Sequence, residues 1–151
     1  MLPHILLLAQ LSAIAVIDLR RFIIPDALSA ALLLTGLGSC WWYGLEPMVW
    51  RLSAAAAGFL SLYLVDHIYR HLRGRRGMGM GDAKLFAGSG AWVGLAGLPS
   101  VLLWAVASAL AHAILLHLAG TRLKATRRIP FGPHLALGTA LVWFLGPFVL
   151  A

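Results

Sequence analysis

Charged residues are scarce in this sequence. Asp, Glu, Lys and Arg together make up 11% of its 151 residues, whereas apolar residues make up 61%. A water-soluble protein surrounds its core with a charged surface, and this chain carries too little charge to build one. Together with a mean hydropathy of +0.88, the composition predicts an all-α integral membrane protein whose apolar segments cross the bilayer as helices.

Cysteine is almost absent, because Cys40 is the only one in the chain. A single cysteine excludes an internal disulfide and a zinc site built from several thiolates. The six histidines show no spacing typical of metal ligands. His67 and His71 lie beside a basic segment, and His112 and His117 are five residues apart, a spacing that does not place two side chains on one helix face. We therefore expect no metal and no cofactor.

Acidic residues are rarer than basic ones, five against twelve, and the formal net charge is +7. Such an excess suits nucleic-acid binding, but membrane proteins also acquire it in their cytoplasmic loops, so we expect no nucleic-acid partner. Only Arg51 lies on one side of the expected helices, and the other basic residues lie on the opposite side. The positive-inside rule predicts that this second side faces the cytoplasm and that both termini face away from it. Its eleven basic residues are Arg20, Arg21, Arg70, Arg73, Arg75, Arg76, Lys84, Arg122, Lys124, Arg127 and Arg128.

Six apolar runs separated by polar residues predict six transmembrane helices in one membrane-embedded domain, residues 1–151. The first run lacks the basic start of a secretory signal, so we expect it to be retained as a membrane helix. Pro99 is expected to separate the fourth helix from the fifth, and the Gly90–Gly94 pair to allow close helix contact. The expected helices are residues 2–19, 26–43, 48–68, 82–97 and 100–120, and a sixth that follows "IPFGP" and reaches the C-terminus.

Three of the five acidic residues have ordinary structural interpretations. Glu46 lies in an expected loop, where water solvates it. Asp66 stands four residues before Arg70 on the third expected helix, a spacing that favours an ion pair. Asp26 opens the second expected helix, where its side chain is expected to cap a free backbone N–H.

Asp18 and Asp82 have no such interpretation. Asp18 closes "IAVID" within the first apolar run, and Asp82 begins the fourth expected helix. An ionisable side chain in or at the edge of a membrane span is costly, and by default it marks function. The first helix ends and the fourth begins on the cytoplasmic side. We therefore expect the two aspartates to meet at that face.

Two facing carboxylates suit peptide-bond hydrolysis without a covalent intermediate. Close like charges resist ionising together, so the pair shares one proton. The ionised member activates water as a base, while the protonated member donates a hydrogen bond to the scissile carbonyl. Helix ends favour Asp82, at a helix N-terminus, as the anion and Asp18, near a helix C-terminus, as the acid. This division of roles is a hypothesis, because a coupled pair titrates as a unit.

Two irregular segments lie next to the expected helices. Gly77, Gly79 and Gly81 allow backbone conformations closed to other residues and the approach of an extended peptide, although a loop without chemistry has the same composition. A phosphate-binding loop is disfavoured because neither GK[ST] nor a strand accompanies these glycines. In "IPFGP", Pro130 and Pro133 interrupt helical hydrogen bonding. This segment either walls a substrate groove or starts a helix at a proline.

The segments "GMGMGDAKL" and "IDLRRFIIPD" together resemble those of the type IV prepilin peptidases, which are GxGD intramembrane aspartyl proteases. The resemblance covers nearly the whole chain, and "RRIPFGPHLALG" resembles the opening of the family's last helix. It implies that Asp18 and Asp82 are the catalytic aspartates, Asp18 opening a stretch that Pro25–Asp26 closes. It also implies an endopeptidase that removes basic leader peptides from prepilin or pseudopilin precursors at the cytoplasmic face of the inner membrane.

One departure and two alternatives qualify that expectation. Many members of the family carry an N-terminal cytoplasmic segment with paired cysteines that is associated with N-methylation, and this sequence resembles the short form without it, so we expect no methyltransferase activity. One alternative is a GxGD protease with other membrane substrates. The other is a small transporter or proton pathway that uses Asp18 and Asp82. A transporter is expected to place its acids near the bilayer midplane and to show repeated halves, and neither feature is visible here.

Overall fold

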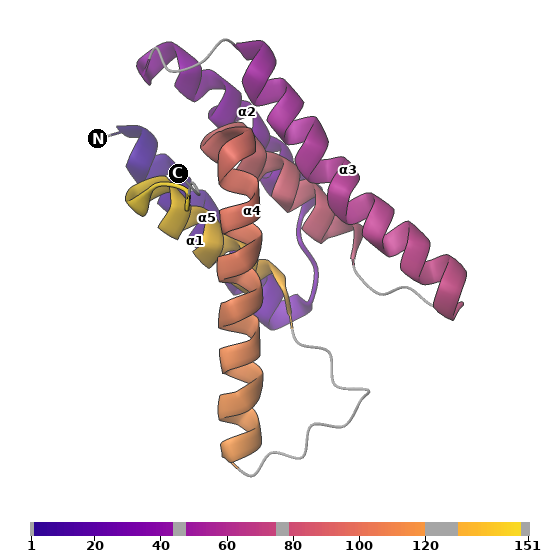
Figure 1. Cartoon of the computed structure of the whole chain (residues 1–151). Helices are drawn as coiled ribbons and strands as arrows, with labels where there is room; N and C mark the ends of the chain where they lie inside the picture. Colours follow the sequence, from indigo (N-terminus) through magenta and orange to yellow (C-terminus); the bar gives the residue numbers. More distant parts are fainter. Residues whose placement is uncertain (1, 44–47, 75–78, 120–129, 149–151) are drawn as a thin grey trace.

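The computed structural model describes residues 2–43, 48–74, 79–119 and 130–148. These ranges contain helices and connecting segments and no strand, which confirms the all-α prediction for the part of the chain they cover (Figure 1). The helices are α1 (Leu2–Arg21), α2 (Asp26–Tyr43), α3 (Met48–Arg73), α4 (Met80–Leu118) and α5 (Gly132–Leu145). Of these, α1, α3 and α4 are long and apolar enough to cross a membrane, and α2 and α5 are shorter apolar helices.

The expected boundary between the fourth and fifth helices is misplaced. Residues 82–97 and 100–120 were expected to form two helices, and the structure has two helical segments within α4 (Met80–Leu118) that are divided at another residue. The interruption inside α4 lies at Gly94, whose φ of 74° and ψ of 177° are non-helical. Only glycine adopts such angles at low cost. Pro99 does not end a helix, because it lies inside the second half of α4, five residues after the break.

The break divides α4 into two halves with different surroundings. Figure 1 shows the chain turning sharply between the pink first half and the orange second half. A helix interrupted at Gly94 leaves the carbonyls of the preceding turn without their usual partners. The buried Arg51 side chain of α3 meets this need, because its Nη1 donates to the Ala91 carbonyl at 3.3 Å and to the Trp92 carbonyl.

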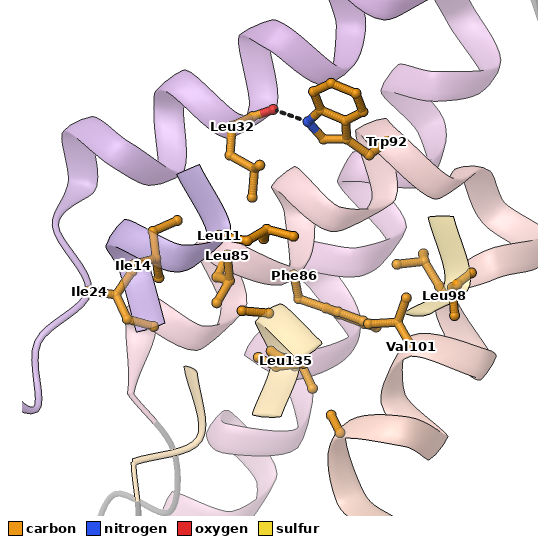
Figure 2. Close-up of a cluster of buried hydrophobic side chains, with 14 of the residues drawn as sticks. Leu11, Ile14, Ile24, Leu32, Leu85, Phe86, Trp92, Leu98, Val101 and Leu135 are labelled. Carbon is orange, nitrogen blue, oxygen red and sulfur yellow. Dashed lines mark hydrogen bonds between the residues drawn. The ribbon is translucent and has the colours of Figure 1, made fainter. Parts of the chain in front are cut away.

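The first half of α4 lies at the centre of the packing, against α2, α3 and α5. Figure 2 shows its buried side chains Leu85, Phe86 and Trp92 among apolar side chains of the neighbouring helices. The Trp92 indole Nε1 donates to the Leu32 carbonyl of α2 at 2.9 Å, which satisfies the polar group of a fully buried ring.

The close helix contact expected of the glycine pair is confirmed at Gly90. A Cβ placed on Gly90 would lie 2.6 Å from the Ala54 carbonyl oxygen of α3, so only glycine allows the two backbones to approach this closely. Gly94 has a different function, since it forms the break itself.

Candidate active site

Asp18 lies in the last turn of α1, where it is 5% exposed. Its Oδ2 accepts a hydrogen bond from the backbone N–H of Gly132, the first residue of α5, at 3.0 Å. The first N–H groups of a helix have no partner within the helix and carry a partial positive charge. The start of α5 therefore offers a stabilising donor to a carboxylate that burial would otherwise disfavour.

Gly132 leaves room for this contact. A Cβ at this position would lie 2.6 Å from the Asp18 Oδ2, which is closer than two such atoms can approach. Pro133 follows in the first turn of α5, so the proline-initiated helix start, one of the two interpretations of "IPFGP", is confirmed. A substrate-groove function of the same segment stays a prediction.

Asp82 lies in the first turn of α4, three residues after the N-cap Gly79. Its carboxylate accepts a hydrogen bond from the Gly79 backbone N–H, and its own N–H donates to the Gly79 carbonyl at 3.1 Å. An acidic side chain that reaches back from this position to the N-cap is one half of a capping box. The motif therefore fixes the direction of the Asp82 side chain.

The structure brings the two aspartates together, as the sequence predicted. The Asp82 carboxylate is close enough to Asp18 for their charges to interact. One carboxylate comes from the end of α1 and the other from the start of α4, 64 residues later. Both of them accept a hydrogen bond from a backbone N–H at the start of a helix. Helix ends therefore do not separate an acid from a base here, and the expected assignment of Asp18 as the acid loses its basis.

Ile24 packs between the two helix starts that carry the site, and it is buried. A Cβ on Gly81 would lie 3.0 Å from the Ile24 Cβ, and a Cβ on Gly132 would lie 3.1 Å from the Ile24 Cδ1. Gly79 has a φ of −78°, and Gly81 is not among the positive-φ glycines. Neither glycine therefore uses the conformational freedom that the sequence suggested, and the absence of a side chain at Gly81 instead allows close packing against Ile24. Gly77 lies outside the described residues.

The turn after α1 aims Ile24 at this position. Phe22 adopts a φ of 54°, in the left-handed region that residues other than glycine seldom occupy. Its N–H donates to the Asp18 carbonyl at 2.8 Å, which closes the last turn of α1. The backbone oxygen of Asp18 thus belongs to a helix-ending turn, while its side chain faces α5.

Two ion pairs account for the acidic residues farther from the centre. The Asp66 Oδ2 lies 2.5 Å from the Arg70 Nη2, so the ion pair expected from their spacing is confirmed. Asp26 lies inside the first turn of α2, and its Oδ1 accepts a hydrogen bond from Lys84 Nζ of α4 at 2.7 Å. This pair was not predicted from the sequence, in which Asp26 was expected to cap a helix and Lys84 contributed only its positive charge. Glu46 lies outside the described residues.

A cavity of about 540 Å³ lies between α2, α3 and α4. Small and apolar side chains, including Phe59 and Ala87, form most of its wall, and Asp26 and Lys84 also line it. Ser29 contributes a buried hydroxyl that makes no hydrogen bond within the described part of the protein. The cavity thus joins an apolar surface to an ion pair whose lysine lies two residues after Asp82.

The chemistry open to this site is that of two coupled carboxylates. A water molecule held between them can lose a proton to one carboxylate, while the other donates a hydrogen bond to a carbonyl. Across the described ranges, no group of three or more His, Cys, Asp or Glu side chains is placed to hold a metal ion.

The sequence matches the Type IV leader peptidase family over residues 5–115. Among similar proteins is the Prepilin leader peptidase/N-methyltransferase of Burkholderia pseudomallei, 37% identical over 145 residues that make up 95% of this chain and 47% of that protein. The protein of the same name from Xanthomonas campestris pv. campestris is 41% identical over 143 residues, 94% of this chain and 49% of the relative. That from Aeromonas salmonicida is 38% identical over 144 residues, again 94% and 49%.

The chain spans about half the length of these curated relatives. No solved structure shows significant similarity to it.

Proposed function

Since the chain belongs to the type IV leader peptidase family, we propose that it is a membrane aspartyl endopeptidase that cleaves the basic leader peptide from type IV prepilin-like or pseudopilin precursors. The observation that carries this proposal is the convergence of Asp18 and Asp82 from two separate helix ends, each held by a backbone N–H. We assign these two aspartates as the catalytic residues. The N-methyltransferase activity in the relatives' names is not part of the proposal.

The proposed reaction uses the pair in the state that carries one proton. The ionised carboxylate removes a proton from water, and the resulting hydroxide attacks the scissile carbonyl carbon. The protonated carboxyl donates a hydrogen bond to the carbonyl oxygen, where negative charge develops. Collapse of the tetrahedral intermediate breaks the C–N bond, and the leaving amine takes up the proton that water lost. The pair returns to its starting state without a covalent enzyme intermediate.

The substrate would lie partly in the bilayer. The cavity between α2, α3 and α4 has the apolar wall that a membrane-embedded peptide segment needs, and it reaches Lys84, two residues after Asp82. If an apolar segment of the substrate bound there, the substrate residues that precede this segment would lie close to Asp82. The scissile bond would then be presented to the aspartates from the aqueous side.

For the topology, we propose six crossing segments in one domain, residues 1–151: α1, α2, α3, the two halves of α4, and α5. The eleven basic residues that sequence analysis places on one side would face the cytoplasm, and both termini would lie on the other side of the inner membrane. Asp18 at the end of α1 and Asp82 at the start of α4 would then share the cytoplasmic face, where a leader peptide resides before export. A C-terminal reporter that is active only outside the cytoplasm tests this topology.

Cleavage of a precursor in a reconstituted system is the direct test of the function. The full chain is incorporated into liposomes with a purified prepilin, and mass spectrometry of the product identifies the bond that is cut. We expect loss of the leader with the wild-type chain and no product with the D18N/D82N variant. Cleavage by both proteins would overturn the assignment of the aspartates. A pH-driven proton flux across the same liposomes, without cleavage, would instead support a proton pathway.

A further inference from the structure

A second cluster of titratable side chains joins the second half of α4 to α5. Ser108 and His112 lie one turn apart on α4, and His134 lies in the first turn of α5. The His112 Nδ1 lies 3.3 Å from the His134 Nε2, and the Ser108 Oγ lies 3.0 Å from the His134 Nδ1. All three side chains are partly buried. The proposed peptidase reaction uses none of them.

The contacts of Ser108 favour the tautomer of His134 in which Nε2 carries no proton. The Ser108 hydroxyl donates to the Ala105 carbonyl at 3.0 Å, so its single proton is already used. When the hydroxyl proton makes this bond, the Ser108 oxygen accepts a hydrogen bond from the Nδ1–H tautomer of His134. The neutral His134 ring then carries a bare lone pair on Nε2, and this lone pair faces the His112 ring. Metal-binding histidines are oriented in the same way, by a hydrogen bond to the nitrogen that does not bind the metal.

The separation of the two facing nitrogens also suits a metal ion. A tetrahedral zinc ion with Zn–N distances of about 2.0–2.1 Å holds two ligand nitrogens about 3.3–3.4 Å apart. The observed 3.3 Å lies at that value, whereas an N–H···N hydrogen bond at this distance is long. The two rings are tilted by 48° rather than stacked. Because the χ2 angle of histidine is soft, a small ring rotation points both lone pairs at one ion.

We propose that His112 and His134 form a binding site for one divalent transition-metal ion of the kind that imidazole prefers, such as Zn²⁺, Cu²⁺ or Ni²⁺. The two histidines supply two ligands, and water fills the remaining positions, since no third His, Cys, Asp or Glu of the described residues joins them. The bound ion would link the second half of α4 to the first turn of α5. This site is separate from the proposed peptidase chemistry, which needs no metal.

His67 and His71 form a second histidine pair that the test must separate from this one. They lie four residues apart on α3 with ring centroids 4.6 Å apart. A helical pair at this spacing also binds transition metals when both rings face one ion. It is therefore removed by the substitutions H67Q and H71Q, and binding is measured in that background, in protein without a histidine tag.

The experiment measures Zn²⁺ binding to the detergent-solubilised full chain, by competition with a chromophoric chelator, and the thermal unfolding temperature with and without Zn²⁺. In the H67Q/H71Q background we expect one bound Zn²⁺ per chain and a higher unfolding temperature in its presence. Adding H112Q or H134Q should abolish both effects. The S108A variant keeps both ligands but loses the bond that orients His134, so its affinity should fall about 10-fold or more.

Electron paramagnetic resonance shows whether the ion binds to both His112 and His134. With Cu²⁺ as the probe, the electron paramagnetic resonance spectrum should show coupling to two imidazole nitrogens in the H67Q/H71Q protein. It should show coupling to fewer than two nitrogens after H134Q. An absence of binding in the H67Q/H71Q background, or equal binding after H112Q and H134Q, would overturn the proposal and leave the two histidines as a hydrogen-bonded contact between helices.

Discussion

Among the described residues, the charged side chains of Asp18, Arg51 and Asp66 are buried, and the first two each face the end of a helix. Asp18 is 5% exposed and accepts a hydrogen bond from the Gly132 N–H at the start of α5. Arg51 is 6% exposed and donates to the Ala91 and Trp92 carbonyls, where the first half of α4 ends. The anion thus faces the positive end of a helix and the cation faces the negative end, as the helix dipole favours.

The neighbours of the two charges differ. Asp18 lies within interaction distance of Asp82, which carries the same charge. Arg51 instead satisfies carbonyls that the break at Gly94 deprives of helical partners. A pair of like charges opposes folding, so such a pair is kept for its chemistry, whereas a cation on free carbonyls supports folding. The function of a buried charge in a membrane helix is therefore inferred from its neighbours and not from its burial alone.

Substitution of the aspartates should give the largest effect on activity. Asp18→Asn and Asp82→Asn should each reduce prepilin cleavage by at least about 10²–10⁴-fold, because neither partner activates water alone. The thermal stability in detergent should not fall, since the substitution removes an ionisable group that burial and its like-charged partner disfavour. Asp26→Asn and Asp66→Asn are the matched controls and should retain much of the activity. Near wild-type cleavage by either dyad variant would contradict the proposed mechanism.

Gly132 tests whether the position of Asp18 matters as well as its presence. Gly132→Val should lower cleavage about 100-fold, because the new side chain displaces the Asp18 carboxylate from the α5 N–H. Gly38→Val is the control, since a Cβ at Gly38 meets no atom within 4 Å. Cleavage and thermal stability are measured on both proteins. An active Gly132→Val variant would show that the contact to α5 is not needed for catalysis.

Arg51 should show the opposite pattern, a loss of stability with normal activity per folded molecule. Arg51→Met removes the donors of two buried carbonyls and should lower the free energy of unfolding by about 2–4 kcal/mol. Arg51→Lys, which keeps the charge but offers a different donor geometry, should lower it less. Unfolding is followed by helical circular dichroism in denaturant. If Arg51→Met instead abolished cleavage at unchanged stability, the contrast with Asp18 would fail.

The Asp26–Lys84 pair should give the smallest effect on stability. Both side chains are exposed enough for water to screen their attraction, at 74% and 38% of the side-chain surface. Lys84→Met should therefore change the free energy of unfolding by no more than about 1 kcal/mol. Asp26→Met is the matched variant. A loss of cleavage with Lys84→Met that Asp26→Met does not reproduce would show that Lys84 contacts the substrate rather than only its partner.

Sequence patterns predicted the parts of the structure that depend on local residue order. The bounds of α2 match the expected 26–43, and the Asp66–Arg70 pair follows from helical spacing. The meeting of Asp18 and Asp82 followed from the side of the membrane at which each helix ends. Predicting these features requires only the period of the apolar residues, the spacing of the charged residues along a helix and a count of the basic residues on each side.

Features that depend on the three-dimensional packing were not predicted. The break in α4 was expected at Pro99, because the stabilising Arg51 comes from α3 and no pattern within residues 82–120 reveals it. The partner of Lys84 lies 58 residues away. His112 was compared with His117, its neighbour in sequence, although its partner is His134 on another helix. Contacts between helices that approach only after folding leave no periodic signal in the sequence.

The bend in α4 has a consequence for the order in which the protein is made. The ribosome delivers α3 to the membrane before α4, so Arg51 is in place when Ala91, Trp92 and Gly94 emerge. The free carbonyls at the bend would be costly in lipid without that side chain. The second half of α4 can therefore reverse direction only against an α3 that is already inserted. We therefore expect that a circular permutant that places α4 before α3 is degraded at the membrane rather than accumulating.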